Sequence, residues 1–150
     1  MVMFGCNGKQ PYGLKDTILN IESTGEFVCN LSTYPLRNPM NLSSASLTPD
    51  TNEFEVSGLE MEPSNLINVP RVKESPIHME CKYFKTFELP CFQAGGRNAI
   101  ITGQVIGINF HEDILKDGLV DIKRIQPLAR MGYMDYTCVE KIFEIQRPND

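Results

Sequence analysis

Two strand-like runs separated by a turn, between residues 77 and 110, constrain the fold of this chain most strongly. Residues 77–89 (IHMECKYFKTFEL) begin with apolar side chains at every second position, which is typical of a half-buried strand. Residues 90–98 contain a Gly-Gly pair, and residues 99–110 (AIITGQVIGINF) are the most strand-like run in the sequence. The pattern therefore predicts a long antiparallel hairpin.

Two glycines, Gly103 and Gly107, interrupt the second of these runs. An isolated glycine in a strand pattern indicates a bend, a bulge or a close approach of another part of the chain. Further strands are predicted at residues 27–31 and at residues 139–147, the latter as the last strand of the chain. Residues 128–136, which are aromatic and interrupted by glycine, predict a loop.

The order of these elements favours a mainly β fold. Only one β–α–β unit is visible, at the start of the chain, and the later strands follow one another with short helices or turns between them. Parallel sheets need a crossover between strands, commonly a helix, so this order predicts an antiparallel barrel with short peripheral helices rather than a doubly wound sheet.

A glycine- and proline-rich loop precedes the first predicted helix, which begins near Asp16 and ends at Gly25. Leu14, Ile18 and Ile21 fall on one face of that helix, and Asp16 is the expected N-terminal cap. A helix N-terminus carries unpaired N–H groups and a partial positive charge.

This helix start is a candidate seat for a phosphate, formed by Asn7, Lys9, Lys15, Asp16 and Thr17. Its sequence is neither a P-loop nor a GxGxxG dinucleotide turn. The alternative from the pattern alone is an ordinary surface loop whose lysines are solvated.

Two other segments carry side chains of chemical interest. Asn109 and His111 lie at the end of the glycine-interrupted strand, where His111 is either an acid–base group or a solvated turn residue. Residues 130–136 (RMGYMDY) place an arginine and two tyrosines in one loop. Such side chains flank a planar ligand, plug the end of a barrel or form a dimer contact.

Composition excludes several classes of function. The chain has 150 residues and a net charge of −5, which fits one soluble domain and argues against binding a nucleic-acid polymer. Five scattered cysteines without a CxxC pair, and only two histidines, give no zinc-ligand set. Free thiols predict a reducing cytoplasm, and no apolar run is long enough to span a membrane.

The chain resembles the flavin reductase-like proteins of the FMN-binding split-barrel superfamily nearly from end to end. No single piece is specific, but the order and spacing of the pieces are. The pieces are Met3-Phe4, Lys15-Asp16-Thr17, Asn20-Ile21, Gly25-Glu26-Phe27-Val28, Asn30, Met40-Asn41, Pro70-Arg71-Val72, Glu74-Ser75-Pro76, Glu80-Cys81, Gly103, Val105, Asp117-Gly118, Asp121, Pro127-Leu128-Ala129-Arg130, Gly132 and Tyr136.

The resemblance implies a six-stranded antiparallel split barrel that forms a homodimer, binds FMN and moves reducing equivalents between NAD(P)H and the flavin. Lys15, Asp16 and Thr17 match its phosphate-side motif, and Asn7 lies in the preceding loop. Asn109 occupies a position where many members have histidine.

Residues 1–150 correspond to one such domain that is short at its N-terminal end, so an incomplete barrel is expected. The alternative is a flavin-binding or interaction module without turnover.

Overall fold

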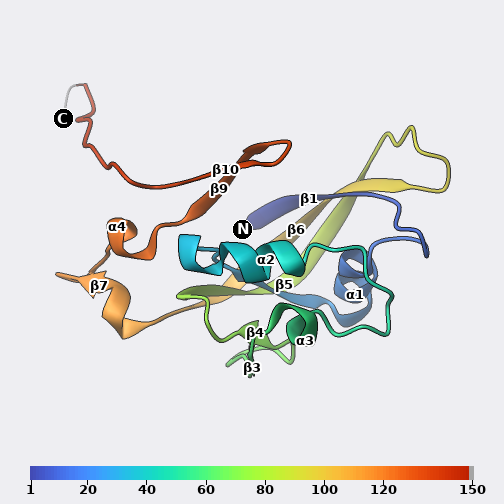
Figure 1. Ribbon diagram of the computed structural model, residues 1–150, viewed down its shortest axis with the longest axis horizontal. Helices are drawn as coiled ribbons and strands as arrows, with labels where there is room; N and C mark the ends of the chain where they lie inside the picture. The colour runs from blue at the N-terminus through green and yellow to red at the C-terminus, as the bar shows by residue number, and fades with distance from the viewer. Residues whose placement is uncertain (149–150) are drawn as a thin grey trace.

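The computed structural model describes residues 1–148, and Figure 1 shows its arrangement. The elements along the chain are β1 (Val2–Gly8), α1 (Asp16–Thr24), β2 (Glu26–Asn30), the 3₁₀ turn η1 (Tyr34–Leu36), α2 (Arg37–Leu42), α3 (Glu53–Ser57), β3 (Met61–Glu62), β4 (Arg71–Val72), β5 (Ile77–Leu89), β6 (Arg97–Phe110), the 3₁₀ turn η2 (Glu112–Ile114), β7 (Leu115–Lys116), β8 (Leu119–Val120), α4 (Ile122–Ile125), β9 (Leu128–Gly132) and β10 (Asp135–Cys138).

The predicted hairpin is confirmed as the centre of the fold. Strands β5 and β6 pair antiparallel from Ile77 opposite Phe110 to Leu89 opposite Asn98. Strand β1 joins the far side of β6 and β2 joins the far side of β5, so the sheet order is β1-β6-β5-β2 (Figure 1). The mainly β, antiparallel split-barrel prediction is therefore confirmed.

This curled sheet is half of a barrel. It holds four of the strands described in residues 1–148, fewer than the six that the family resemblance implied. Within that part of the chain, no further strand pairs with the outer edges of β1 and β2. The fold is therefore an open half-barrel with two free edges.

A small core joins helix α1 to the sheet. Ile18 and Ile21, on the apolar face predicted for this helix, are buried against residues of β1, β2, β5 and β6. Gly25 ends α1 in the left-handed conformation at φ 71°, which a glycine adopts without strain.

Gly103 is the close approach that the sequence predicted. A Cβ atom built on it would lie only 2.3 Å from Cζ of Phe27. The ring of Phe27 therefore occupies the space that a side chain at position 103 would need. Because glycine has no side chain, β2 and β6, which are not neighbours in the sheet, contact each other in the core at this point.

Two predictions at the C-terminal end were wrong. The predicted loop at residues 128–136 contains β9 and the start of its partner β10, joined through Tyr133 and Met134. Gly132, at the end of β9, and Tyr133 both have positive φ. The predicted last strand at residues 139–147 forms no strand. Its Ile142, Phe143 and Ile145 side chains are exposed, and a strand without a neighbour has no hydrogen-bond ladder to hold it.

Candidate functional site

The start of α1 carries no side-chain cap. Lys15 occupies the cap position with an extended backbone, and its side chain accepts no hydrogen bond from the helix. Asp16 was expected to be the cap, and this was wrong: it lies inside the first turn and accepts a hydrogen bond from the hydroxyl of Tyr12 at 3.2 Å. The first-turn N–H groups are therefore left without a side-chain acceptor.

The cysteines near this region are unreactive in character. Cys6 is buried below the helix start, and burial raises the pKa of its thiol despite the nearby positive charges of Lys15 and Arg97. Burial and the adjacent thiol of Cys29 raise the pKa of Cys81 to about 12. Neither Cys6 nor Cys81 is a thiolate at neutral pH, so neither is a ready nucleophile.

A groove of about 850 Å³ lies between the two free edges of the half-barrel. Its apolar lining includes Val2 and Phe4 from β1 and Val28 from β2. Thr17, from the first turn of α1, reaches the same groove. Volume and lining are those of a site for an organic cofactor or substrate, which such clefts bind through apolar walls and a few polar groups.

A second, polar pocket of about 240 Å³ adjoins this groove, and Thr17 lines both. Asn20 and the loop residues Thr48, Thr51 and Asn52 also line it. Glu53 lies at the boundary of the two pockets, and burial together with the charge of Asp16 raises its pKa.

The structure separates Asn7 and Asn109, two of the predicted site residues. Asn7 pairs with Asn98 near the start of β6, whereas Asn109 lies eleven residues further along that strand. At about 3.3 Å per residue the two are about 36 Å apart along β6. Asn7 is exposed, one residue beyond Cys6, and lines neither the groove nor the polar pocket.

The amide of Asn109 is used within the protein. It donates to Oε1 of Glu80 at 2.6 Å and accepts from the side chain of Asn65 at 2.6 Å. Glu80 is fully buried and also accepts from the backbone N–H groups of Asn65 (2.9 Å) and Leu66 (2.7 Å). This cluster ties the segment before β4 to the central sheet.

Burial alone would raise the pKa of Glu80, but the two backbone donors and Asn109 outweigh it. The pKa of this carboxyl therefore lies below its usual value, and Glu80 is an anion at neutral pH.

His78, which the sequence patterns did not single out, is almost fully buried beside the same cluster. Its Nε2 donates to the carbonyl of Val72 at 2.7 Å, so the neutral ring carries its proton on Nε2. Among the described residues its Nδ1 has no partner, and the ring of His111 lies 6.1 Å away, centroid to centroid. Burial lowers the pKa of His78.

We expect the stability of the protein to fall as the pH drops below about 6.5, because the unfolded chain then binds a proton that native His78 resists. In H78Q, the free energy of unfolding in urea should change less between pH 7 and pH 5 than in the wild type. An equal slope in H78Q and the wild type would contradict this assignment.

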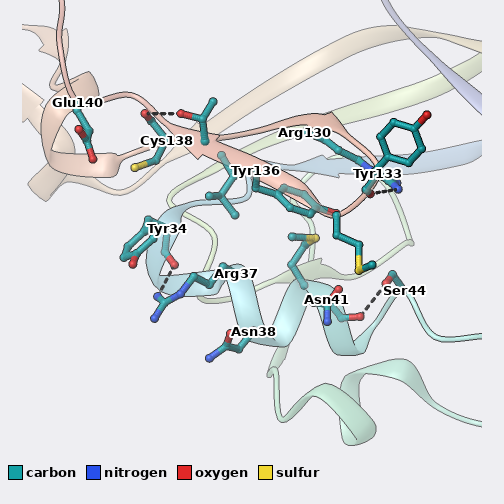
Figure 2. Close-up of a pocket in the computed structure, with 14 residues that line it drawn as sticks. Tyr34, Arg37, Asn38, Asn41, Ser44, Arg130, Tyr133, Tyr136, Cys138 and Glu140 are labelled. Atoms are coloured by element: carbon teal, nitrogen blue, oxygen red, sulfur yellow. Dashed lines mark hydrogen bonds between the residues drawn. The ribbon is translucent and has the colours of Figure 1, made fainter.

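A third pocket, of about 700 Å³, lies between α2 and the β9–β10 hairpin (Figure 2). Figure 2 shows the lining residues Tyr34, Arg37 and Asn41 on the helix side and Arg130 and Tyr136 on the hairpin side. The sequence pointed to the hairpin half of this pocket. It missed the helix half, whose only signal is a tyrosine followed three residues later by an arginine.

Comparison with known proteins decides the family. The sequence model described as flavin reductase like domain matches residues 1–128. The chain belongs to the flavin reductase-like family. This membership supports flavin binding and a flavin-related oxidoreductase function. None of the helices described in residues 1–148 is long and apolar enough to cross a membrane.

Two relatives are about 30% identical to the chain over the aligned residues. An uncharacterized protein of Halalkalibacterium halodurans is 32% identical over 94% of this chain and 68% of its own length. One from Aquifex aeolicus is 30% identical over 88% of this chain and 65% of its own length. The chain thus spans about two thirds of the length of these curated relatives.

Solved structures of flavin reductase-like proteins share the fold. Nitrilotriacetate monooxygenase component B from Bacillus cereus is 26% identical, covering 95% of this chain and 71% of its own, with a TM-score of 0.83. Flavoredoxin of Desulfovibrio vulgaris is 21% identical, covering 87% of this chain and 68% of its own, with a TM-score of 0.73.

Proposed function

We propose that this chain binds FMN and moves reducing equivalents between NAD(P)H and that flavin. The observation that carries the proposal is the uncapped start of α1 beside the groove. Lys15 and the first-turn N–H groups, which have no side-chain acceptor, suit the phosphate, and the hydroxyl of Thr17 adds a donor. Asp16 belongs to this site as a residue of the first turn, and its carboxylate accepts a hydrogen bond from Tyr12.

The residues present fit the chemistry of this cofactor. FMN has an apolar planar ring, a polyhydroxylated chain and a phosphate. Three regions of different polarity meet at Thr17. They are the apolar groove, the helix start, and the polar pocket lined by Asn20, Thr48, Thr51 and Asn52. The two carboxylates of Asp16 and Glu53 oppose an anion there, and the raised pKa of Glu53 reduces that opposition as the pH falls.

The protein's part in the reaction is to hold and orient the cofactor. Bound FMN would supply the hydride-accepting chemistry. The apolar walls of Val2, Phe4 and Val28 exclude water from the ring, and Lys15 and Thr17 fix the position of its tail. Asn109 stays a predicted flavin contact, although its amide already bonds with Glu80 and Asn65.

A flavin-binding module without turnover is the second candidate, favoured by the open edges of β1 and β2 beside the groove. We further propose a homodimer, since Ile142, Phe143 and Ile145 expose apolar surface that association would bury. Bleaching of the bound flavin by NADH or NADPH separates the enzyme from the module, and the sedimentation mass of the same sample tests the dimer.

We expect K15A and T17A each to weaken FMN binding about tenfold, because each removes a group that contacts the phosphate. Isothermal titration measures the affinity. Riboflavin, which lacks the phosphate, is the matched ligand and should bind the wild type and both variants alike. E53Q should have the opposite effect and tighten FMN binding.

Replacement of the distant, exposed Lys116 by Ala is the control for a general loss of positive charge. Unchanged FMN affinity in both K15A and T17A would show that the phosphate lies elsewhere. Equal losses for FMN and riboflavin would show that the variants disturb the groove rather than a phosphate seat.

A further inference from the structure

The pocket between α2 and the β9–β10 hairpin is separate from the proposed flavin seat. It is built by segments about 90 residues apart in the chain, and its volume of about 700 Å³ lies in the range of small-molecule sites. The segment that follows α2 separates the two sites, because Ser43 lines the groove and the next residue, Ser44, lines this pocket.

Each long wall of the pocket presents an arginine above a tyrosine ring. The guanidinium of Arg37 lies 4.1 Å from the ring centroid of Tyr34, and that of Arg130 lies 6.0 Å from the ring centroid of Tyr136. Both arginines are also held by backbone carbonyls, Arg37 by Tyr34 at 2.8 Å and Arg130 by Tyr133 at 3.1 Å. Each arginine therefore has a ring and a carbonyl of its own wall beside it.

These two arginines have no carboxylate partner among residues 1–148. In contrast, Arg71, Arg97 and Arg124 each pair with a carboxylate. In a chain with a net charge of −5, two arginines without acidic partners on facing walls of one pocket form a local positive site. Glu140 is the one acidic side chain that lines it.

We propose that this pocket binds a planar aromatic anion. The arginines supply charge-assisted hydrogen bonds to a phosphate or carboxylate, and the tyrosine rings supply stacking surface. The amides of Asn38 and Asn41 and the hydroxyl of Ser44 add hydrogen-bonding groups along the α2 wall. Two kinds of ligand fit this description, a nucleotide and a free aromatic carboxylate. The side chains of this pocket suit both.

Calorimetric titration of the full chain with ADP and, separately, with benzoate tests the proposal. We expect at least one of them to bind, and we expect the uncharged adenosine to bind more weakly than ADP. Binding of ADP alone identifies a nucleotide site, and binding of benzoate alone identifies an aromatic carboxylate site. Absence of binding for both overturns the proposal.

Substitutions locate the site. R37M and R130M should each lower the affinity for the ligand about tenfold, because each removes one charged contact. R124M removes an exposed arginine outside the pocket and should leave the affinity unchanged. Y136L keeps both arginines and should weaken binding through lost stacking. Unchanged affinity in R37M, R130M and Y136L, with native circular dichroism, overturns the assignment to this pocket.

The flavin seat is tested in the same titrations. Binding of ADP or benzoate should be unaffected by K15A and by T17A, so the proposal does not depend on the proposed function. Weaker binding of that ligand in K15A or T17A would place it at the flavin seat and overturn the separate site.

Discussion

Replacement of Gly103 by Ala should destabilise the protein by about 3 kcal/mol, since overpacking a filled core costs typically 1–3 kcal/mol and the contact here is severe. The added methyl group would lie 2.3 Å from Cζ and 2.5 Å from Cε1 of Phe27, and 3.2 Å from the carbonyl oxygen of Lys82. Phe27 is buried and cannot swing into solvent without leaving the core. Urea unfolding followed by circular dichroism measures the loss.

Gly5 is the matched control for this substitution. It lies in the neighbouring strand β1, where an added Cβ atom would meet only Asn7, at 3.8 Å. G5A should therefore change the free energy of unfolding by less than about 1 kcal/mol. The double variant G103A/F27L should lose less stability than the sum of the two single variants. Strict additivity would show that the clash with Phe27 is not the cause.

Replacement of Glu80 by Ala should cost about 3 kcal/mol, because hydrogen bonds to a charged group contribute about 1.5–3 kcal/mol each and the loss leaves their donors without an acceptor. Glu80 binds the backbone of Asn65 and Leu66 and the side chain of Asn109. We therefore expect the amide hydrogens of Asn65 and Leu66 to exchange faster in E80A, in addition to the loss of global stability.

The pH dependence of this loss has a definite sign. The pKa of Glu80 is lower in the folded protein than in the unfolded chain, so its stabilising contribution is complete above about pH 4.3. The difference between the wild type and E80A should shrink as the pH falls below that value. Glu74, an exposed carboxylate that accepts one backbone hydrogen bond from Glu60, is the control. An equal cost for E74A and E80A would contradict the assignment.

The sequence predicted well those features that depend on neighbouring residues. Alternation in residues 77–89 and 99–110 located the central hairpin, because one face of a strand is buried and the other is not. The apolar spacing of Ile18 and Ile21 and the glycine at position 25 located α1 for similar local reasons. The family resemblance rested on such local pieces in their order.

The sequence failed where the outcome depends on which partner a residue or segment finds in the folded chain. Asp16 is a good cap by residue type, but its carboxylate is held by Tyr12 and does not cap the helix. Residues 139–147 alternate, yet form no strand because no neighbour pairs with them. Residues 128–136 looked like a loop but form a hairpin that faces α2.

The amino-acid sequence by itself determined the antiparallel sheet, helix α1 and the flavin reductase-like family of this protein. These follow from periodicity and short motifs, which depend on residues that are close together in the sequence. Only the tertiary structure decided that Thr17 joins an apolar groove to a polar pocket, that Asn109 belongs to the Glu80 cluster, and that Arg37 and Arg130 line one pocket. Those juxtapositions arise when the sheet curls and brings distant segments together, which no local pattern encodes.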